Sequence, residues 1–333
     1  MASHLLIDTD PGIDDALAIL LALASPEARI ETVTVVAGNV PVDLAAANAR
    51  RILAVAAPTP MPPVIRGAEA PLKRALVTAG HVHGQDGLGN LDRFVEADGR
   101  LRYPEPASPK PPSMVETRSA AEAILETVDR WGPELTVVAL GPLTNLAAAA
   151  ALDARRLARA GRVVVMGGAV AVPGNVTPAA EFNFFVDPEA AAQVLEAGLA
   201  VELIPLDVTR RVVLAQAVLT ERLRRCPDNR IARFILDFTL HGFAFGAAEE
   251  GGGGIVLHDP LAMAVALDPS LVTFEPMSVE VECEGKLTRG LSLADRRGIP
   301  SHRKRVPSCR VAMAVDADAV LRLFLERLCP ASA

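Results

Sequence analysis

The sequence predicts an α/β protein, with a single large domain and a mostly parallel central sheet flanked by helices. Short β-branched runs alternate with helical patterns along the first two thirds of the 333-residue chain, as in consecutive βαβ units. The apolar run at 4–7 is predicted to be the first strand, and 16–23 the first helix. No shift in composition marks a boundary, so one domain is expected over residues 1–333.

The same alternation predicts the remaining elements. Strands are expected at 31–36, 135–140, 162–166 and 201–206, and helices at 42–57, 119–131, 143–151 and 188–197. Pro11, Pro142 and Pro188 stand near the expected helix starts, where proline is favoured. In the last eighty residues, 272–282 alternates like a strand, 285–295 can pair with it, and 311–316 precedes a final helix.

Charge and cysteine content exclude several classes of partner. The formal net charge of −7 argues against nucleic acid or an anionic membrane as the main partner. No uninterrupted apolar run reaches about 18 residues, so no transmembrane helix is expected. The four cysteines lack CxxC spacing, which disfavours a zinc site. Their sparseness, together with an N-terminus that lacks a signal-peptide pattern, predicts a cytoplasmic protein.

Three carboxylates follow the first predicted strand. Asp10, Asp14 and Asp15 are expected to cluster at the carboxyl edge of the sheet, where open α/β folds bind their ligands. Like charges this close repel, and a divalent cation removes the conflict. Hard oxygen ligands suit Ca²⁺ or Mg²⁺. The alternative is that the aspartates only cap the next helix, but three of them beside Pro-Gly favour a functional site.

Four later segments also place polar side chains beside predicted strands or helices. Asn39 ends the second strand, where a turn role is the alternative. His81 and His83 lie in a glycine-rich loop, for which facing a substrate is favoured over binding zinc. Two amides and a carboxylate within 174–183 suit sugar hydroxyls, which need donors and acceptors. Asp259 precedes an apolar helical run, where it can equally be an N-cap.

Taken together, these segments resemble the inosine–uridine-preferring nucleoside hydrolase family. The shared motifs are DTDPGIDD at 8–15, AGN at 37–39, GPLTN at 141–145, EFN at 181–183 and HDP at 258–260. The match extends through 287–290 and 295–298, so it covers essentially the whole chain. The resemblance implies a Rossmann-like nucleoside hydrolase fold. It also implies Ca²⁺-dependent hydrolysis of the N-glycosidic bond of ribonucleosides to free base and ribose.

The resemblance further implies roles for single residues. Ca²⁺ would be held by Asp10, Asp15 and Asp259 and by the main-chain carbonyl of Leu140. Asp10 would take a proton from the attacking water. His258 would protonate the leaving base, the alternative being that it only orients Asp259. The substrate-binding residues would be Asp14, Asn39, His83, Met166, Asn175, Glu181, Phe182, Asn183 and His241.

The expected base-binding side departs from the family pattern. Several members place a tyrosine on the helix after the fourth βαβ region, whereas this chain has Phe234, Phe238, His241, Phe243 and Phe245 there. The spacing of Phe234, Phe238 and His241 places these three on one helix face. His241 can read a base edge, but a core-facing stripe suits the phenylalanines at least as well. The choice between purine and pyrimidine nucleosides therefore stays open. The resemblance also implies a homodimer or homotetramer.

Two other functions remain as alternatives. Asp8-Thr9-Asp10 superficially resembles the aspartyl-nucleophile motif of Mg²⁺-dependent phosphohydrolases, although no convincing phosphate-binding Lys or Arg motif follows the later strands. The second alternative is a nucleoside-binding protein without catalytic activity. The presence of every acidic residue of the expected metal site argues against it.

Overall fold

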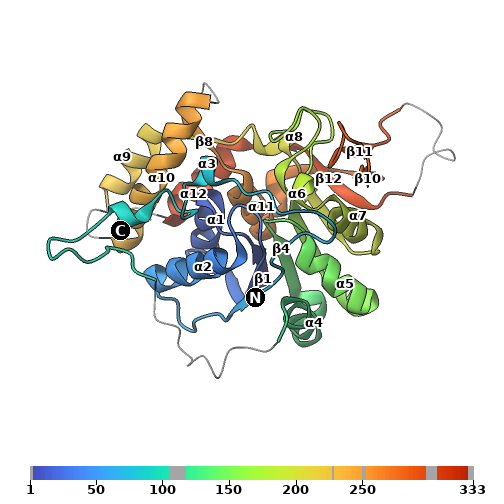
Figure 1. The fold of residues 1–333 in the computed structure, drawn as a ribbon, viewed down its shortest axis with the longest axis horizontal. Helices are drawn as coiled ribbons and strands as arrows, with labels where there is room; N and C mark the ends of the chain where they lie inside the picture. The colour runs from blue at the N-terminus through green and yellow to red at the C-terminus, as the bar shows by residue number, and fades with distance from the viewer. Residues whose placement is uncertain (1–2, 106–117, 227–228, 250–252, 298–305, 329–333) are drawn as a thin grey trace.

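The predicted alternation is present in the structure, a computed structural model that describes residues 3–105, 118–226, 229–249, 253–297 and 306–328 (Figure 1). The strands are β1 (Ser3–Thr9), β2 (Ala28–Val35), β3 (Val64–Arg66), β4 (Leu135–Ala139), β5 (Arg162–Met166), β6 (Val201–Ile204), β7 (Val213–Ala215), β8 (Gly254–Val256), β9 (Val272–Met277), β10 (Val279–Val281), β11 (Ser292–Ala294) and β12 (Cys309–Val315). The helices are α1 (Ile13–Leu23), α2 (Val42–Ala56), α3 (Gly80–His83), α4 (Ala120–Trp131), α5 (Thr144–Leu157), α6 (Phe182–Val186), α7 (Pro188–Glu196), α8 (Leu206–Thr209), α9 (Gln216–Arg224), α10 (Arg230–Glu249), α11 (His258–Leu267) and α12 (Ala317–Leu328).

Eight strands form the central sheet, in the order β3-β2-β1-β4-β5-β6-β12-β9. Every neighbouring pair from β3 to β12 is parallel, and β9 pairs antiparallel with β12. The chain winds outward from β1 through β2 to β3, then returns to place β4 on the other side of β1. The strand order therefore reverses between β1 and β4, and ligands bind at such a reversal in open α/β sheets.

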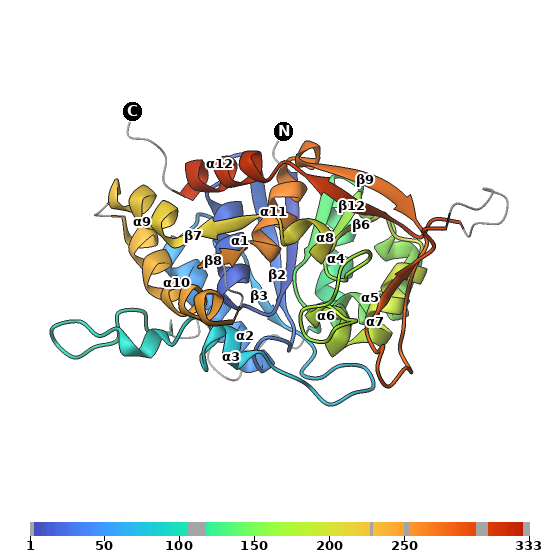
Figure 2. The ribbon, with the colours of Figure 1, turned by 90° about the horizontal axis from the view of Figure 1, so that it is seen from above.

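The sheet is covered on both faces, which explains the nearly continuous apolar runs of its strands. Alternate residues of β1 divide between two cores: Leu5 and Ile7 pack with α1 and α11, and Leu6 packs with α4 and α5. All three side chains are fully buried. Helices α1, α11 and α12 lie on one side of the sheet and α4, α5 and α7 on the other (Figure 2). Helix α11 packs along α1.

The structure confirms the predicted fold class, a single α/β domain with a mostly parallel sheet. The strands expected at 135–140 and 162–166 are β4 and β5. The strand expected at 272–282 is divided into β9 and β10: β10 pairs with β11 as expected, whereas β9 pairs with β12 in the central sheet. The edge strand β3 was not predicted, because three residues leave no periodic pattern. The prediction of one domain over all 333 residues includes segments outside the described ranges, and stays a prediction there.

Helix α10 differs from expectation in one respect. Residues 230–248 are long and apolar enough to cross a membrane by length and composition, although no such helix was predicted. In this fold the helix packs against α1, α2, α9 and β8. Its Phe234 and Phe238 are fully buried, with ring centroids 5.0 Å apart. The apolar character of α10 therefore comes from aromatic side chains that face the core, which is one of the two interpretations that the sequence allowed.

Cysteine chemistry is mixed in the described residues. Cys283 and Cys309 are free thiols, and Cys226 is disulfide-bonded. The predicted cytoplasmic location is not tested by this and stays a prediction.

Candidate active site

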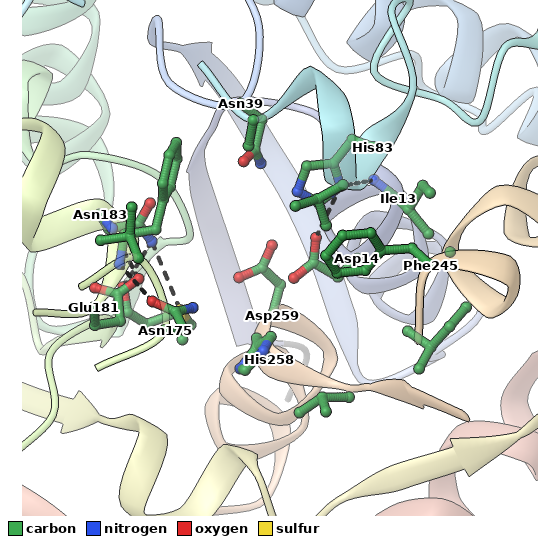
Figure 3. Close-up of a pocket in the computed structure, with 18 of the residues that line it drawn as sticks. Ile13, Asp14, Asn39, His83, Asn175, Glu181, Asn183, Phe245, His258 and Asp259 are labelled. Atoms are coloured by element: carbon green, nitrogen blue, oxygen red, sulfur yellow. Dashed lines mark hydrogen bonds and ion pairs between the residues drawn. The ribbon is translucent and has the colours of Figure 1, made fainter. Parts of the chain in front are cut away.

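A cavity of about 230 Å³ opens at the carboxyl ends of β1, β4 and β5, beside the reversal of strand order. Asn175, Glu181 and Asn183 line one side of it, and Asp14, His83 and Phe245 line the other, with Asp259 and His258 between them (Figure 3). The predicted residues that line it are Asp14, Asn39, His83, Leu140, Met166, Asn175, Glu181, Phe182, Asn183, His258 and Asp259.

Asp15 is fixed beneath the cavity by the chain around it. Its carboxylate accepts hydrogen bonds from the Thr9 hydroxyl (2.5 Å), the Gly12 amide (2.8 Å) and the Asn39 side-chain amide (3.1 Å). The side chain is fully buried. Its place in the first turn of α1 also puts the negative charge at the positive end of a helix. Asp15 is thus a preorganised carboxylate, as well as a cap for α1.

Asp10 is fully buried, and only one of its two carboxylate oxygens accepts a hydrogen bond. One oxygen, Oδ2, accepts a hydrogen bond from the Asn39 main-chain amide at 2.6 Å, whereas Oδ1 has no hydrogen-bond partner within the described residues. The pKa of Asp10 is raised well above its usual value, chiefly by burial and then by the charge of Asp15. Buried polar atoms are normally paired, so the free oxygen indicates a missing ligand.

Glycine makes room for this carboxylate. A Cβ added at Gly141 would lie 2.5 Å from Asp10 Oδ1 and 3.0 Å from Val36. No side chain fits there unless Asp10 moves. The close approach explains why glycine follows Leu140, just beyond the end of β4.

Three further carboxylate oxygens converge beside Asp10. Ligand atoms of Asp14, Asp15 and Asp259 lie within 4.8 Å of one another. Burial and then the charge of Asp15 raise the pKa of Asp14 to about 8. The pKa of Asp259 is also raised well above its usual value, by burial and then by Asp14. Three carboxyl groups with raised pKa values, Asp10, Asp14 and Asp259, thus surround Asp15, and two of them carry unpaired oxygens. This arrangement fits a hard divalent cation.

Two of the predicted Ca²⁺ ligands, the Leu140 carbonyl and Asp10, each depart from the expected arrangement. The Leu140 carbonyl lies at the cavity but accepts a hydrogen bond from the Asn183 side-chain amide at 2.7 Å. Asp10 lies outside the tight group of three oxygens, in which Asp14 takes its place. The described residues therefore offer both Asp10 and Asp14 to an ion at this edge.

Glu181 and Asn175 organise the side of the cavity that follows β5. Glu181 is buried and accepts hydrogen bonds from the Gly168 amide (2.9 Å) and the Asn183 amide (2.8 Å), and burial raises its pKa. The Asn175 side-chain oxygen accepts from the Phe182 amide at 3.0 Å. Arg210 donates to the carbonyls of residues 173 and 174, at 2.8 and 2.6 Å. These contacts hold the 173–183 loop against the cavity.

Two buried histidines face the carboxylates. His83 accepts a hydrogen bond from the Ile13 amide at its Nδ1 (3.1 Å), which also lies 3.8 Å from Asp14. His258 Nδ1 lies 2.8 Å from the Thr209 hydroxyl. Burial lowers the pKa of each histidine to about 4, and Arg210 contributes to the shift at His258. Both rings are therefore neutral near pH 7.

Some predicted residues lie elsewhere. Asp10 and Asp15 are buried beneath the cavity surface and do not line it. His241 does not line it either: its Nε2 lies 3.3 Å from the His81 carbonyl, and His81 is the lining residue. His241 is excluded from the lining because α10 presents a different face to the cavity, the face that carries Gly242 and Phe245.

An apolar wall of the cavity was predicted only in part. Its members are Val77, Ala79, Val82, Phe245, Ile255 and Val256. Phe245 was among the aromatic residues expected on the base-binding helix, and the structure places it in this wall. The short stretch 77–82 has no periodic pattern that distinguishes it from an ordinary loop.

Comparisons with known proteins agree with this site. The family model for inosine-uridine preferring nucleoside hydrolase matches residues 5–322. The chain is 37% identical over 331 residues to the pyrimidine-specific ribonucleoside hydrolase RihA of Klebsiella pneumoniae subsp. pneumoniae, covering 98% of this chain and 99% of that protein. A plant nucleoside hydrolase, PpNRh1, superposes with a TM-score of 0.86 at 33% identity, over 99% of this chain and all of that one.

A further solved structure extends the comparison. The purine-preferring ribonucleoside hydrolase from Gardnerella vaginalis superposes with a TM-score of 0.85 at 33% identity, covering 98% of both chains. The family model and these relatives each span nearly the full length, and the motifs on which the resemblance rests surround the cavity. The chain therefore belongs to the inosine-uridine preferring nucleoside hydrolase family.

Proposed function

We propose that this protein hydrolyses the N-glycosidic bond of ribonucleosides to free base and ribose, with Ca²⁺ held by Asp10, Asp15, Asp259 and the Leu140 carbonyl. The observation that carries the proposal is the buried carboxylate group with unpaired oxygens at the cavity. Ca²⁺ accepts six to eight oxygen ligands in flexible geometry, which leaves positions for water and sugar hydroxyls. The bound ion would supply Lewis-acid activation of the attacking water.

Asp10 acts as the general base. Its unpaired Oδ1 is free to accept a proton, and the Asn39 amide on Oδ2 fixes the carboxylate. The bond from C1′ to the base nitrogen breaks with its electron pair passing to the base, and the water oxygen bonds to C1′. Positive charge grows on the ribose as the bond breaks, and the surrounding carboxylates stabilise it.

His258 assists the departing base by a hydrogen bond. A general acid would need a protonated ring, whereas burial lowers the pKa of His258 to about 4. We therefore assign the neutral ring a donor role toward the negative charge that develops on the base. The base takes its proton from solvent on release, and Asp10 returns the water proton to solvent, so the reaction balances as nucleoside plus water giving base plus ribose.

The remaining predicted residues bind the sugar. Asp14, Asn39 and Asn183 present donors and acceptors for the ribose hydroxyls. Glu181 and Asn175 hold the 5′-hydroxyl end from the loop that Arg210 anchors. The apolar wall accepts the base. The relatives compared include pyrimidine-specific and purine-preferring enzymes, so the base preference is assigned by experiment.

The test is a ribose-release assay on inosine, adenosine, uridine and cytidine, each with a chelator and with added Ca²⁺ or Mg²⁺. We expect release that disappears with the chelator and returns with Ca²⁺. Binding of the four nucleosides is measured in parallel by calorimetry. Tight binding of intact nucleosides without ribose release would instead identify a silent binding protein, and phosphate release from nucleotides a phosphohydrolase.

Substitution of Gly141 by alanine should impair catalysis without removing any reacting group. The new Cβ would lie 2.5 Å from Asp10 Oδ1, so the carboxylate must move. A displacement of about 1 Å at a reacting group costs roughly 100-fold in rate, and we expect at least that loss in kcat/KM.

Gly80→Ala is the matched control. Its added Cβ would meet nothing closer than Gln85, at 3.6 Å, and its kcat/KM should stay within about 3-fold of wild type, since surface substitutions cost little. Normal activity of Gly141→Ala would contradict the placement of Asp10.

A further inference from the structure

The His258 ring is held from behind by a residue that does not reach the cavity. Thr209, the last residue of α8, is fully buried, and its hydroxyl oxygen lies 2.8 Å from His258 Nδ1. His258 lines the cavity, whereas Thr209 does not. Since Nδ1 is turned to Thr209, Nε2 is the ring nitrogen left for a bound molecule.

Helix α8 is a firm support for this contact. The Leu206 amide donates to the Gly168 carbonyl at 2.9 Å, and the Asp207 carboxylate accepts from the amides of Val170 and Ala171, at 2.9 and 2.8 Å. These bonds attach α8 to the chain that leaves β5 at the carboxyl edge of the sheet. The Thr209 hydroxyl is thus fixed relative to the carboxylates.

The direction of the hydrogen bond follows from the burial of the hydroxyl. Within the described residues, His258 Nδ1 is the single hydrogen-bond partner of the Thr209 hydroxyl. A buried O–H without an acceptor is costly, so the hydroxyl donates to Nδ1. A neutral imidazole that accepts at Nδ1 carries its hydrogen on Nε2. The contact therefore sets the tautomer as well as the ring orientation.

We propose that Thr209 is a positioning residue for the glycosidic cleavage, which holds His258 so that Nε2–H is directed at the departing base. The inference rests on the proposed function, because it requires a base that leaves this cavity. Thr209 acts only through His258 and touches no substrate atom.

The test compares Thr209→Val, which keeps the shape and removes the hydroxyl, with Thr209→Ser, which keeps the hydroxyl. With the best nucleoside substrate, Thr209→Val should lower kcat about 10- to 100-fold and change KM less than about 3-fold, since the contact matters mainly in the transition state. Thr209→Ser should recover most of the loss. Thr127→Val, at another buried threonine distant from the cavity, controls for removal of a buried hydroxyl.

A second substrate separates positioning from general damage to the site. The leaving group of 4-nitrophenyl riboside departs as a stable anion and needs little assistance, so its kcat should change less than about 3-fold in Thr209→Val. In a His258→Asn background, Thr209→Val should add no further loss with the nucleoside. If Thr209→Val does not fold, Thr209→Cys, which keeps the volume with a weaker donor, replaces it.

The outcomes are distinguishable. Equal losses on both substrates, an undiminished loss in the His258→Asn background, or no loss at all would overturn the role of Thr209. Absence of ribose release by the wild-type protein from any nucleoside would overturn the proposed function itself.

Discussion

Asp10→Asn should reduce ribose release by at least about 1,000-fold, because it removes the general base and one charged oxygen from the proposed Ca²⁺ site. The protein should remain folded, since the asparagine oxygen can still accept the Asn39 amide that Oδ2 now accepts at 2.6 Å. Steady-state rates on the best nucleoside, circular dichroism and thermal unfolding measure the two effects. Asp10→Ala should give the same loss of activity.

Asp8→Asn is the matched control for this experiment. Asp8 is also fully buried, and burial raises its pKa to about 7. Both of its hydrogen bonds, from the Thr34 hydroxyl (2.6 Å) and the Asn145 amide (2.8 Å), go to the same oxygen. The oxygen of an asparagine at position 8 can accept both bonds, so no buried donor loses its partner and activity should stay within about 5-fold of wild type. Near-normal activity of Asp10→Asn would refute the assigned base.

Metal removal should make the stability of the protein depend on pH in a defined direction. In the ion-free protein the pKa of Asp14 is raised to about 8, and those of Asp10 and Asp259 are raised as well. A carboxyl whose folded-state pKa exceeds its unfolded value stabilises the protein below the unfolded pKa, near 4. That contribution is lost as pH rises through the folded value.

The two buried histidines change the stability of the protein in the opposite direction, and they do so at lower pH. Their folded-state pKa values of about 4 lie below the unfolded value near 6.5. Their contribution is therefore present above about pH 6.5 and lost as pH falls toward 4. Between about pH 6.5 and 8 the buried carboxylates, and not the two histidines, change the free energy of unfolding. The stability of the protein should therefore be measured in this range.

We expect the Tm in chelator to fall by at least about 5 °C between pH 6.5 and 8. Added Ca²⁺ should remove most of the fall, because the ion favours the ionised carboxylates of the cluster, and its stabilising effect should grow with pH. A smaller fall should persist from Asp8, whose pKa is raised to about 7 and which lies outside the proposed ligand set. Scanning calorimetry at four pH values, with chelator, Ca²⁺ or Mg²⁺, measures this, and Asp14→Asn should flatten the ion-free profile. A Tm in chelator that stays level or rises across this window would contradict the carboxylate cluster.

Much of the site was predictable because its residues stand next to strong local patterns. Asp10, Asp14 and Asp15 follow a buried strand and open a helix, so any parallel sheet brings them to its carboxyl edge. Asn39 and the 174–183 segment follow other strands to the same edge. The core role of Phe234 and Phe238 was one of the two interpretations that their helical spacing left open.

Other features depend on tertiary packing and leave no local signal. Which face of α10 meets the cavity is decided by how the helix lies on α1 and α2, so Phe245 and not His241 became a lining residue. The apolar residues at 77–82 acquire their place only through the fold. Thr209 is an ordinary helix-end residue in sequence, and its contact with His258 joins two segments separated by 49 residues.

The packing of α11 along α1 has a consequence for the order in which the protein acquires its chemistry. Asp15 is synthesised well before Asp259, which follows it by 244 positions (259 − 15) in the sequence. The N-terminal portion can build β1 and α1 but cannot complete the cluster of three carboxylates. Catalytic activity can therefore arise only once α11 has packed against α1. A nascent or truncated chain that ends before α11 lacks a complete carboxylate cluster.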